Sequence, residues 1–107
     1  METRIVTGER APEADRTLLE GLRRAERWSA EIIAGHSAQD IAEREQCSPR
    51  HILRTAHLSG LSPRIKAAIV EGRQPVDLTL DRLIRDDIPL DFRTQEARYG
   101  LDPRRPC

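Results

Sequence analysis

The sequence predicts an all-α fold, a small bundle of five to six helices that contains a helix-turn-helix. Apolar residues recur at spacings of three and four, as on one face of a helix, and no convincing strand is present. Capping residues mark helix starts, and glycines mark helix ends. The 107 residues suit one domain, which we place at 13–100, between a flexible arm at 1–12 and a disordered tail at 101–107.

The first helix is expected over about 12–34. Its apolar stripe comprises Leu18, Leu19, Leu22, Ala25, Trp28, Ser29, Ile32 and Ile33. Gly35 is suited to the left-handed residue that often ends a helix. Gly21 lies inside the helix, where a glycine costs about 1 kcal/mol relative to alanine.

The second and third helices are separated by a short break. Ser37 with an acidic residue three positions later is a variant of the capping box, so the second helix is expected from after Ser37 to about Glu45. Gln46 occupies the turn position where glycine is usual, which predicts a turn that is either strained or slightly different in shape. Ser48 and Pro49 then start a third helix that extends to about residue 58.

Three shorter helices complete the predicted fold. Ser62 and Pro63 repeat the start of the third helix, and Gly72 ends this fourth one. Thr79 caps a fifth helix, and a sixth helical segment spans 91–99. We expect the first and last helices to close over the central ones, or over a second subunit, through Leu18, Leu22, Trp28, Leu80, Leu83, Ile84, Ile88, Phe92 and Tyr99.

Residues 37–58 have the pattern of a helix-turn-helix, with Ala42 at the helix crossing and Cys47 and Ile52 facing inward. The second helix of such a motif places its N-terminal end in the major groove, where arginine can bond guanine. Free N–H groups after Ser37 and Ser62 suit phosphate. The candidate DNA contacts are Gln39, Ser48, Pro49, Arg50, His51, Arg54 and His57, with Arg64 and Lys66 for the flanking backbone.

The net charge of zero at first argues against nucleic acid, because most nucleic-acid-binding domains are basic. The 18 basic and 18 acidic residues are unevenly distributed, however. Residues 1–46 carry a net charge of −3, residues 47–76 of +4, and residues 77–107 of −1. The positive segment coincides with the third helix, which has no acidic residue. This distribution predicts weak non-specific binding and a strong dependence on Arg50, Arg54 and dimerisation.

Other kinds of site are disfavoured. Cys47, His51 and His57 match no usual zinc spacing, and no catalytic triad, phosphate loop or nucleotide fingerprint is present. Asp86, Asp87 and Asp91 are expected to cap helices and coat a solvated face. We therefore expect no enzyme activity, no cofactor and no metal. Without a signal peptide or a long apolar run, the expected location is cytoplasmic and nucleoid-associated, not a membrane.

Several segments together resemble a helix-turn-helix module at the C-terminus of phage-type serine site-specific recombinases of alphaproteobacteria, a module that also occurs alone in mobile elements. The similar segments are 22–28, 41–45, 48–52, 61–65, 71–75, 77–80 and 88–92, within a span of about 4–101. The helix-turn-helix core is also similar to that of plasmid-partition proteins. The resemblance implies sequence-specific duplex DNA binding through Arg50, His51 and Arg54. It does not imply recombinase activity, because the catalytic serine of those enzymes lies in a separate N-terminal domain.

The resulting hypothesis is a sequence-specific double-stranded DNA-binding protein of a phage or other mobile element. It would act as a transcriptional regulator or as an accessory factor in DNA recombination, possible partners being a second copy of the chain and a recombinase or other mobile-element protein. Two alternatives remain open. The helix-turn-helix could be only the scaffold of a protein-interaction adaptor, or the chain could be a detached C-terminal piece of a recombinase.

Overall fold

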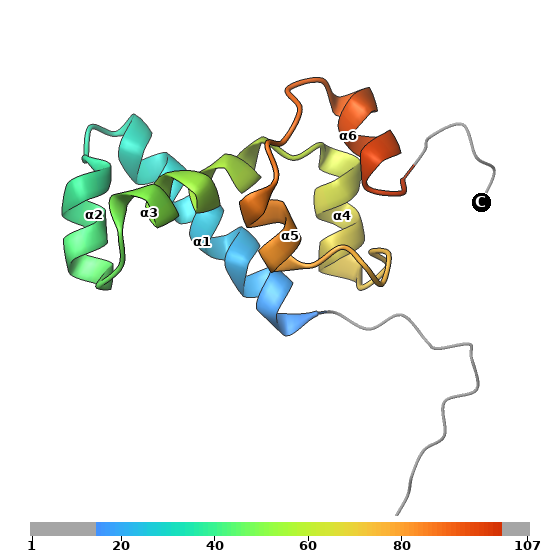
Figure 1. Ribbon diagram of the computed structural model, residues 1–107, viewed down its shortest axis with the longest axis horizontal. Helices are drawn as coiled ribbons and strands as arrows, with labels where there is room; N and C mark the ends of the chain where they lie inside the picture. The colour runs from blue at the N-terminus through green and yellow to red at the C-terminus, as the bar shows by residue number, and fades with distance from the viewer. Residues whose placement is uncertain (1–14, 102–107) are drawn as a thin grey trace, which may run out of the picture.

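The computed structural model describes residues 15–101, and these form six α-helices and one 3-10 helix with no strand among them. The predicted all-α bundle is confirmed (Figure 1). The predicted arm at 1–12 and most of the tail lie outside the described residues. The elements are α1 (Arg16–Ile33), α2 (Ala38–Glu45), α3 (Pro49–Ala56), η1 (His57–Gly60), α4 (Pro63–Glu71), α5 (Leu80–Arg85) and α6 (Phe92–Arg98).

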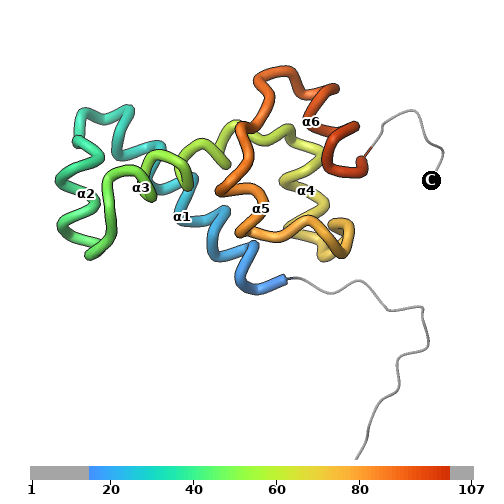
Figure 2. The backbone as a smooth tube through the Cα atoms, viewed as in Figure 1, coloured from blue at the N-terminus to red at the C-terminus, as the bar shows by residue number. Residues whose placement is uncertain are grey.

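Helix α1 is the longest and runs along both parts of the fold. The carboxylate of Asp15 caps its first turn by accepting a hydrogen bond from the Leu18 N–H at 3.1 Å. Gly35 follows its end with a φ of 112°, in the region that favours glycine. Figure 2 shows α2 and α3 at one end of the molecule and α4 and α6 at the other, with α1 extending between them.

Two separate apolar cores lie along α1. The larger core joins α1 to η1, α4, α5 and α6 through Leu18, Leu22, Ala25, Leu58, Leu61, Ile65, Ile69, Leu78, Leu83 and Tyr99. The smaller core joins the C-terminal half of α1 to α2 and α3 through Trp28, Ile41, Ala42, Ile52 and Ala56. The predicted burial of Trp28 is confirmed. Cys47 is half-buried and packs against the smaller core.

Helices α2 and α3 are joined by a tight turn. Ser37 and Ser48 cap them as predicted, each hydroxyl accepting the N–H three residues later at 3.0 Å. Gln46 adopts φ 60° and ψ 48°, a left-handed conformation that costs a non-glycine residue roughly 1–2 kcal/mol. The main-chain N–H of Cys47 reaches back to the Ala42 carbonyl at 3.0 Å. The predicted strain at this turn is therefore present at Gln46.

The glycine inside α1 is explained by a close neighbour. A Cβ added at Gly21 would lie 2.4 Å and 2.9 Å from the two terminal methyl carbons of Leu80, far inside van der Waals contact. Leu80 begins α5 and packs against the larger core. The glycine therefore lets α5 approach α1 closely, which offsets its low helix propensity.

Helix α6 is held by polar contacts at both of its ends. Its cap, Asp91, accepts hydrogen bonds from the hydroxyl and the N–H of Thr94, and these bonds lower the pKa of Asp91. At the other end the Tyr99 hydroxyl donates to Asp86 at 3.0 Å. Burial raises the pKa of Tyr99, and the bond to Asp86 raises it further. The expected capping role of Asp91 is thus confirmed.

Several details differ from the prediction. Ile33 is 83% exposed, because α1 extends past the elements that cover its apolar stripe. Phe92 is 49% exposed at the first turn of α6, so its expected burial against a second subunit stays a prediction. Helix α3 ends at Ala56 rather than near residue 58, because the chain tightens into η1 to bury Leu58. Leu101 packs against the larger core, so the ordered chain continues into the predicted tail.

Candidate nucleic-acid interface

Helix α3 presents one apolar and one polar face. Its inward residues, Ile52, Thr55 and Ala56, are buried against α1 and α2. Arg50 and His57 are exposed on the opposite side, as are Ser48 and Pro49 at the start of the helix, whereas Arg54 is half-buried. The orientation predicted from the sequence is therefore confirmed.

Within residues 15–101, the N-terminal end of α3 retains two unpaired main-chain donors, the N–H groups of Ser48 and Arg50. The His51 N–H bonds the Ser48 hydroxyl at 3.0 Å, and the Ile52 N–H bonds the Ser48 carbonyl at 3.2 Å. Pro49 has no N–H. Within residues 15–101 the Arg50 N–H has no hydrogen-bond partner, and its guanidinium has no carboxylate within 4.0 Å. The positive helix end and the positive side chain therefore lie on the same residue.

A groove of about 440 Å³ lies beside this end of α3, between α3 and α5. The residues around it are Ser48, Arg50, His51, Arg54, Ile84 and Arg85. Three arginines thus line one depression. Sequence reasoning missed Arg85, which is 35 positions from Arg50 and is brought near it only by the packing of α5 beside α3.

The two other arginines of this groove have exposed acidic neighbours. Arg54 lies 3.8 Å from a carboxylate oxygen of Asp87, which is almost fully exposed. Arg85 pairs with Asp81 one turn earlier on α5, and both side chains are largely exposed. Exposed pairs of this kind contribute roughly 0–1 kcal/mol, so an incoming anion can replace either carboxylate.

His51 is positioned by the smaller core. Its ring meets the Trp28 ring edge-on, with centroids 6.1 Å apart and planes at 71°, and its Nε2 lies 3.5 Å from the Thr55 hydroxyl. The indole N–H of Trp28 is buried and has no hydrogen-bond partner within the described chain. The start of α3 is therefore held against α1 through an aromatic pair, while the imidazole remains at the edge of the basic groove.

Helix α2 is tied to α1 by an ion pair. Arg44 donates to both carboxylate oxygens of Glu31, at 3.0 and 3.3 Å, and also contacts Glu45. The hydrogen bond from Arg44 lowers the pKa of Glu31. Gln39 is exposed near the start of α2, so a DNA backbone could reach it. Its side-chain Nε2 donates to a carboxylate oxygen of Glu43 at 3.4 Å.

The basic residues of α4 are directed elsewhere. Arg64 lies 3.6 Å from the carboxylate of Glu96, which is buried, and Lys66 pairs with Glu26 of α1 at 2.8 Å. The Ser62 N–H donates to the buried Gln95 side chain at 2.7 Å. The Ser62 N–H is thus engaged by α6, whereas the Arg64 N–H has no hydrogen-bond partner within residues 15–101, so the expected phosphate contact at this helix start stays a prediction.

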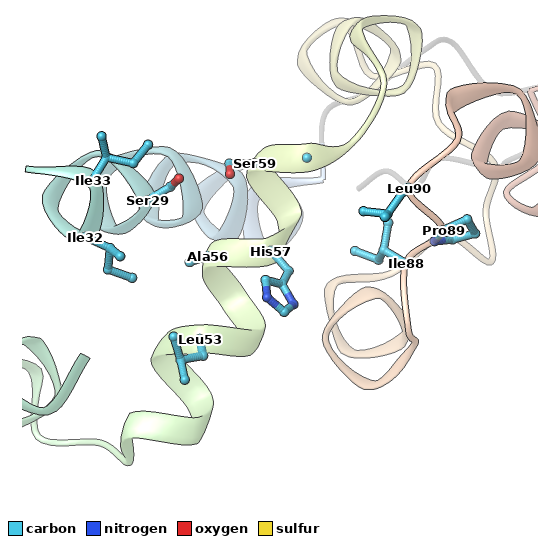
Figure 3. Close-up of a pocket in the computed structure, with 11 residues that line it drawn as sticks. Ser29, Ile32, Ile33, Leu53, Ala56, His57, Ser59, Ile88, Pro89 and Leu90 are labelled. Atoms are coloured by element: carbon cyan, nitrogen blue, oxygen red, sulfur yellow. The ribbon is translucent and has the colours of Figure 1, made fainter. Parts of the chain in front are cut away.

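A second depression, of about 410 Å³, also lies against α3, is apolar and shares no lining residue with the basic groove. Figure 3 shows side chains from α1, α3 and the segment 88–90 around it. Three of its residues, Ile33, Leu53 and Leu90, are large exposed hydrophobic side chains. Its lining carries no formal charge when His57 is neutral. Helix α3 thus contributes residues to both a basic groove and an apolar one.

Among residues 15–101, no three His, Cys, Asp or Glu side chains cluster in a way that could hold a metal ion. None of the helices in that part of the chain combines the length and the apolar character needed to cross a membrane. Comparison of the chain with protein families, curated proteins and solved structures found no match.

Proposed function

We propose that the chain binds double-stranded DNA sequence-specifically, with the N-terminal end of α3 in the major groove. The observation that carries the proposal is the combination at Arg50 of an exposed guanidinium, an unpaired main-chain N–H and no carboxylate within 4.0 Å in the described chain. Arginine at such a position can bond guanine O6 and N7 in bidentate fashion, which is worth about 1–3 kcal/mol of discrimination.

The neighbouring side chains take complementary roles. Arg54 lies one turn after Arg50 and reaches the same groove, and His51 stands at its rim. Ser48 and Gln39 are exposed near the starts of α3 and α2, where polar groups contact the DNA backbone in helix-turn-helix proteins. His57 is exposed one turn after Arg54, on the side of the apolar groove. Because the net charge is zero, non-specific binding is weak and specificity depends on these few residues.

The experiment begins with selection of bound fragments from the genome that encodes the chain, followed by titration of a selected duplex at several salt concentrations. The double variant Arg50→Ala with Arg54→Ala is expected to reduce affinity by about 30-fold or more, from two contacts of about 1–3 kcal/mol each. The matched control is Arg24→Ala with Arg93→Ala, which removes two exposed arginines outside the groove. Absence of any duplex complex at low salt, together with a stable complex with another protein, would favour the adaptor alternative.

We also propose that the functional form is a homodimer, because one recognition helix reads only a few base pairs. The apolar groove supports this, since two copies of a chain with zero net charge can bring uncharged surfaces together without repulsion. The apolar groove shares no lining residue with the basic groove, so a second copy seated there does not need to cover Arg50, Arg54 or Arg85.

The dimer is tested by light scattering of the purified chain across a concentration series. Ile33→Ser with Leu90→Ser is expected to convert a dimer to a monomer, whereas Val76→Ser, at an equally exposed apolar residue outside the groove, leaves the mass unchanged. A wild-type chain that is monomeric both alone and on its selected duplex contradicts the dimer but not DNA binding.

The proposal extends to a role as a transcriptional regulator or as a recombination accessory factor of a phage or mobile element. Its support is the resemblance of the sequence segments to recombinase helix-turn-helix modules. The positions of the selected fragments distinguish the roles: promoters indicate regulation, and sites of strand exchange indicate recombination.

A further inference from the structure

The basic groove receives an arginine from outside the helix-turn-helix. Arg85 is the last residue of α5, and it lines the same depression as Arg50 and Arg54 of α3. Two helices therefore direct guanidinium groups toward one space of about 440 Å³, large enough for a phosphodiester group. Guanidinium groups bind phosphate oxygens through paired hydrogen bonds.

The basic residues of α4 are less suited to a phosphate contact. Releasing Arg64 from Glu96 would leave a carboxylate that is 7% exposed without its partner, and an uncompensated buried charge is strongly destabilising. Lys66 is held at 2.8 Å by Glu26 and is itself half-buried. Both side chains are thus engaged in contacts that hold α4 against α6 and α1.

Arg85 differs because its partner is easily replaced. The pair with Asp81 lies within one helix at a spacing of four residues, and each side chain is 73% exposed. Such pairs stabilise a helix by about 0.3–0.5 kcal/mol. A phosphate can therefore displace Asp81 with little loss of folding stability.

We propose that Arg85 binds the DNA backbone, so that α5 is a second wall of the interface and clamps a phosphate beside the bases contacted by α3. This inference rests on the proposed DNA binding and assigns the backbone contact to α5 rather than to α4. The bound group is a phosphodiester of the duplex, contacted without regard to base sequence.

The test measures affinity and salt dependence for a selected duplex and for an unrelated duplex. Arg85→Ala is expected to weaken both by a similar factor and to reduce the slope of log K against log salt by about 1. Each neutralised phosphate contributes about −0.9 to the slope of log K against log salt, so losing one such contact lowers the affinity about eightfold at 0.1 M salt, relative to 1 M salt. Arg85→Gln, which keeps a long polar side chain, is expected to give the same loss, and Arg85→Lys to keep most of the slope. Thermal unfolding of each variant checks that the fold is intact.

Arg64→Gln is the comparison for the α4 alternative and is expected to lower stability while leaving the salt slope unchanged. The inference is overturned if Arg85→Ala and Arg85→Gln bind like the wild type, or if Arg64→Gln alone lowers the slope. If Arg50→Ala abolishes binding but the Arg85 variants bind normally, the α5 contact is refuted and the proposed DNA binding is not. A wild-type chain that binds no duplex refutes both this contact and the proposed function.

Discussion

The buried amide of Gln95 is a sensitive point of the fold. Gln95 is 1% exposed, its Oε1 accepts from the Ser62 N–H at 2.7 Å, and its Nε2 donates to the carbonyls of Gly60 at 3.0 Å and Pro89 at 2.7 Å. One side chain therefore joins α6 to η1, to the start of α4 and to the segment before α6. Gln95→Met keeps a similar length and removes all three hydrogen bonds.

The expected loss of stability follows from the surroundings of the three partners. Ser62 is fully buried, so its N–H would remain unpaired, at a cost of about 1–3 kcal/mol. Gly60 is exposed and Pro89 is half-buried, so their carbonyls can bond water, and each lost bond counts about 0.5 kcal/mol. The free energy of unfolding should fall by about 2–4 kcal/mol in total.

The assays are urea unfolding and thermal unfolding, each followed by circular dichroism at 222 nm. At about 4–8 °C per kcal/mol for a domain of this size, a loss of about 2–4 kcal/mol should lower the melting temperature by roughly 8–32 °C. Gln74→Met is the matched control, because the Gln74 Oε1 is buried with no hydrogen-bond partner in the described chain. If the two variants lose equal stability, or if Gln95→Met loses less than about 0.5 kcal/mol, the reasoning from the three bonds is wrong.

Three further predictions concern packing, the turn and alkaline pH. Gly21→Ala should stabilise the chain by up to about 1 kcal/mol when Leu80 is also replaced by alanine, but not in the wild type, where the new Cβ would clash with Leu80. If the effects of the two substitutions on the free energy of unfolding simply add, the close contact between Gly21 and Leu80 is unimportant. Gln46→Gly should raise stability by about 0.5–1 kcal/mol and Gln46→Val should lower it, as urea midpoints would show; the opposite order would contradict a left-handed residue there. Because the folded-state pKa of Tyr99 lies above its unfolded value of about 10, the stability it contributes is complete below that value and is lost as pH rises through the folded pKa. Wild-type urea midpoints should therefore fall more above pH 10 than those of Tyr99→Phe, and absorbance of the single tyrosine near 295 nm should titrate late; equal profiles would contradict this.

The helix starts could be predicted because their signals are local. Ser37, Ser48, Ser62, Thr79 and Asp91 each cap a helix by accepting the N–H three residues later. Such a bond needs only one short polar side chain at the right position, so the sequence contains all the information. The same holds for the outward face of α3, which follows from helical periodicity.

The remaining features depend on residues distant in the chain. Gln95 looks like a solvated polar residue of a short helix until α6 packs over Ser62, 33 positions earlier. The role of Glu96 as a buried partner of Arg64, and the entry of Arg85 into the basic groove, likewise arise from packing between helices. Periodicity cannot predict these contacts, because it describes which side of a helix is apolar but not what the polar side meets.

The arrangement of two cores along α1 places one aromatic reporter in each. Trp28, the single tryptophan, lies in the core of α2 and α3, and Tyr99, the single tyrosine, lies in the core of α4, α5 and α6. Fluorescence of the indole therefore follows the opening of the helix-turn-helix, and absorbance of the phenol follows the rest. The core around Trp28 contains fewer buried side chains than the core around Tyr99. The amide protons of α2 and α3 should therefore exchange with solvent faster than those of α4, because the free energy needed to open the smaller core is lower. The natural chain can thus report, without added labels, whether its two halves unfold as one cooperative unit.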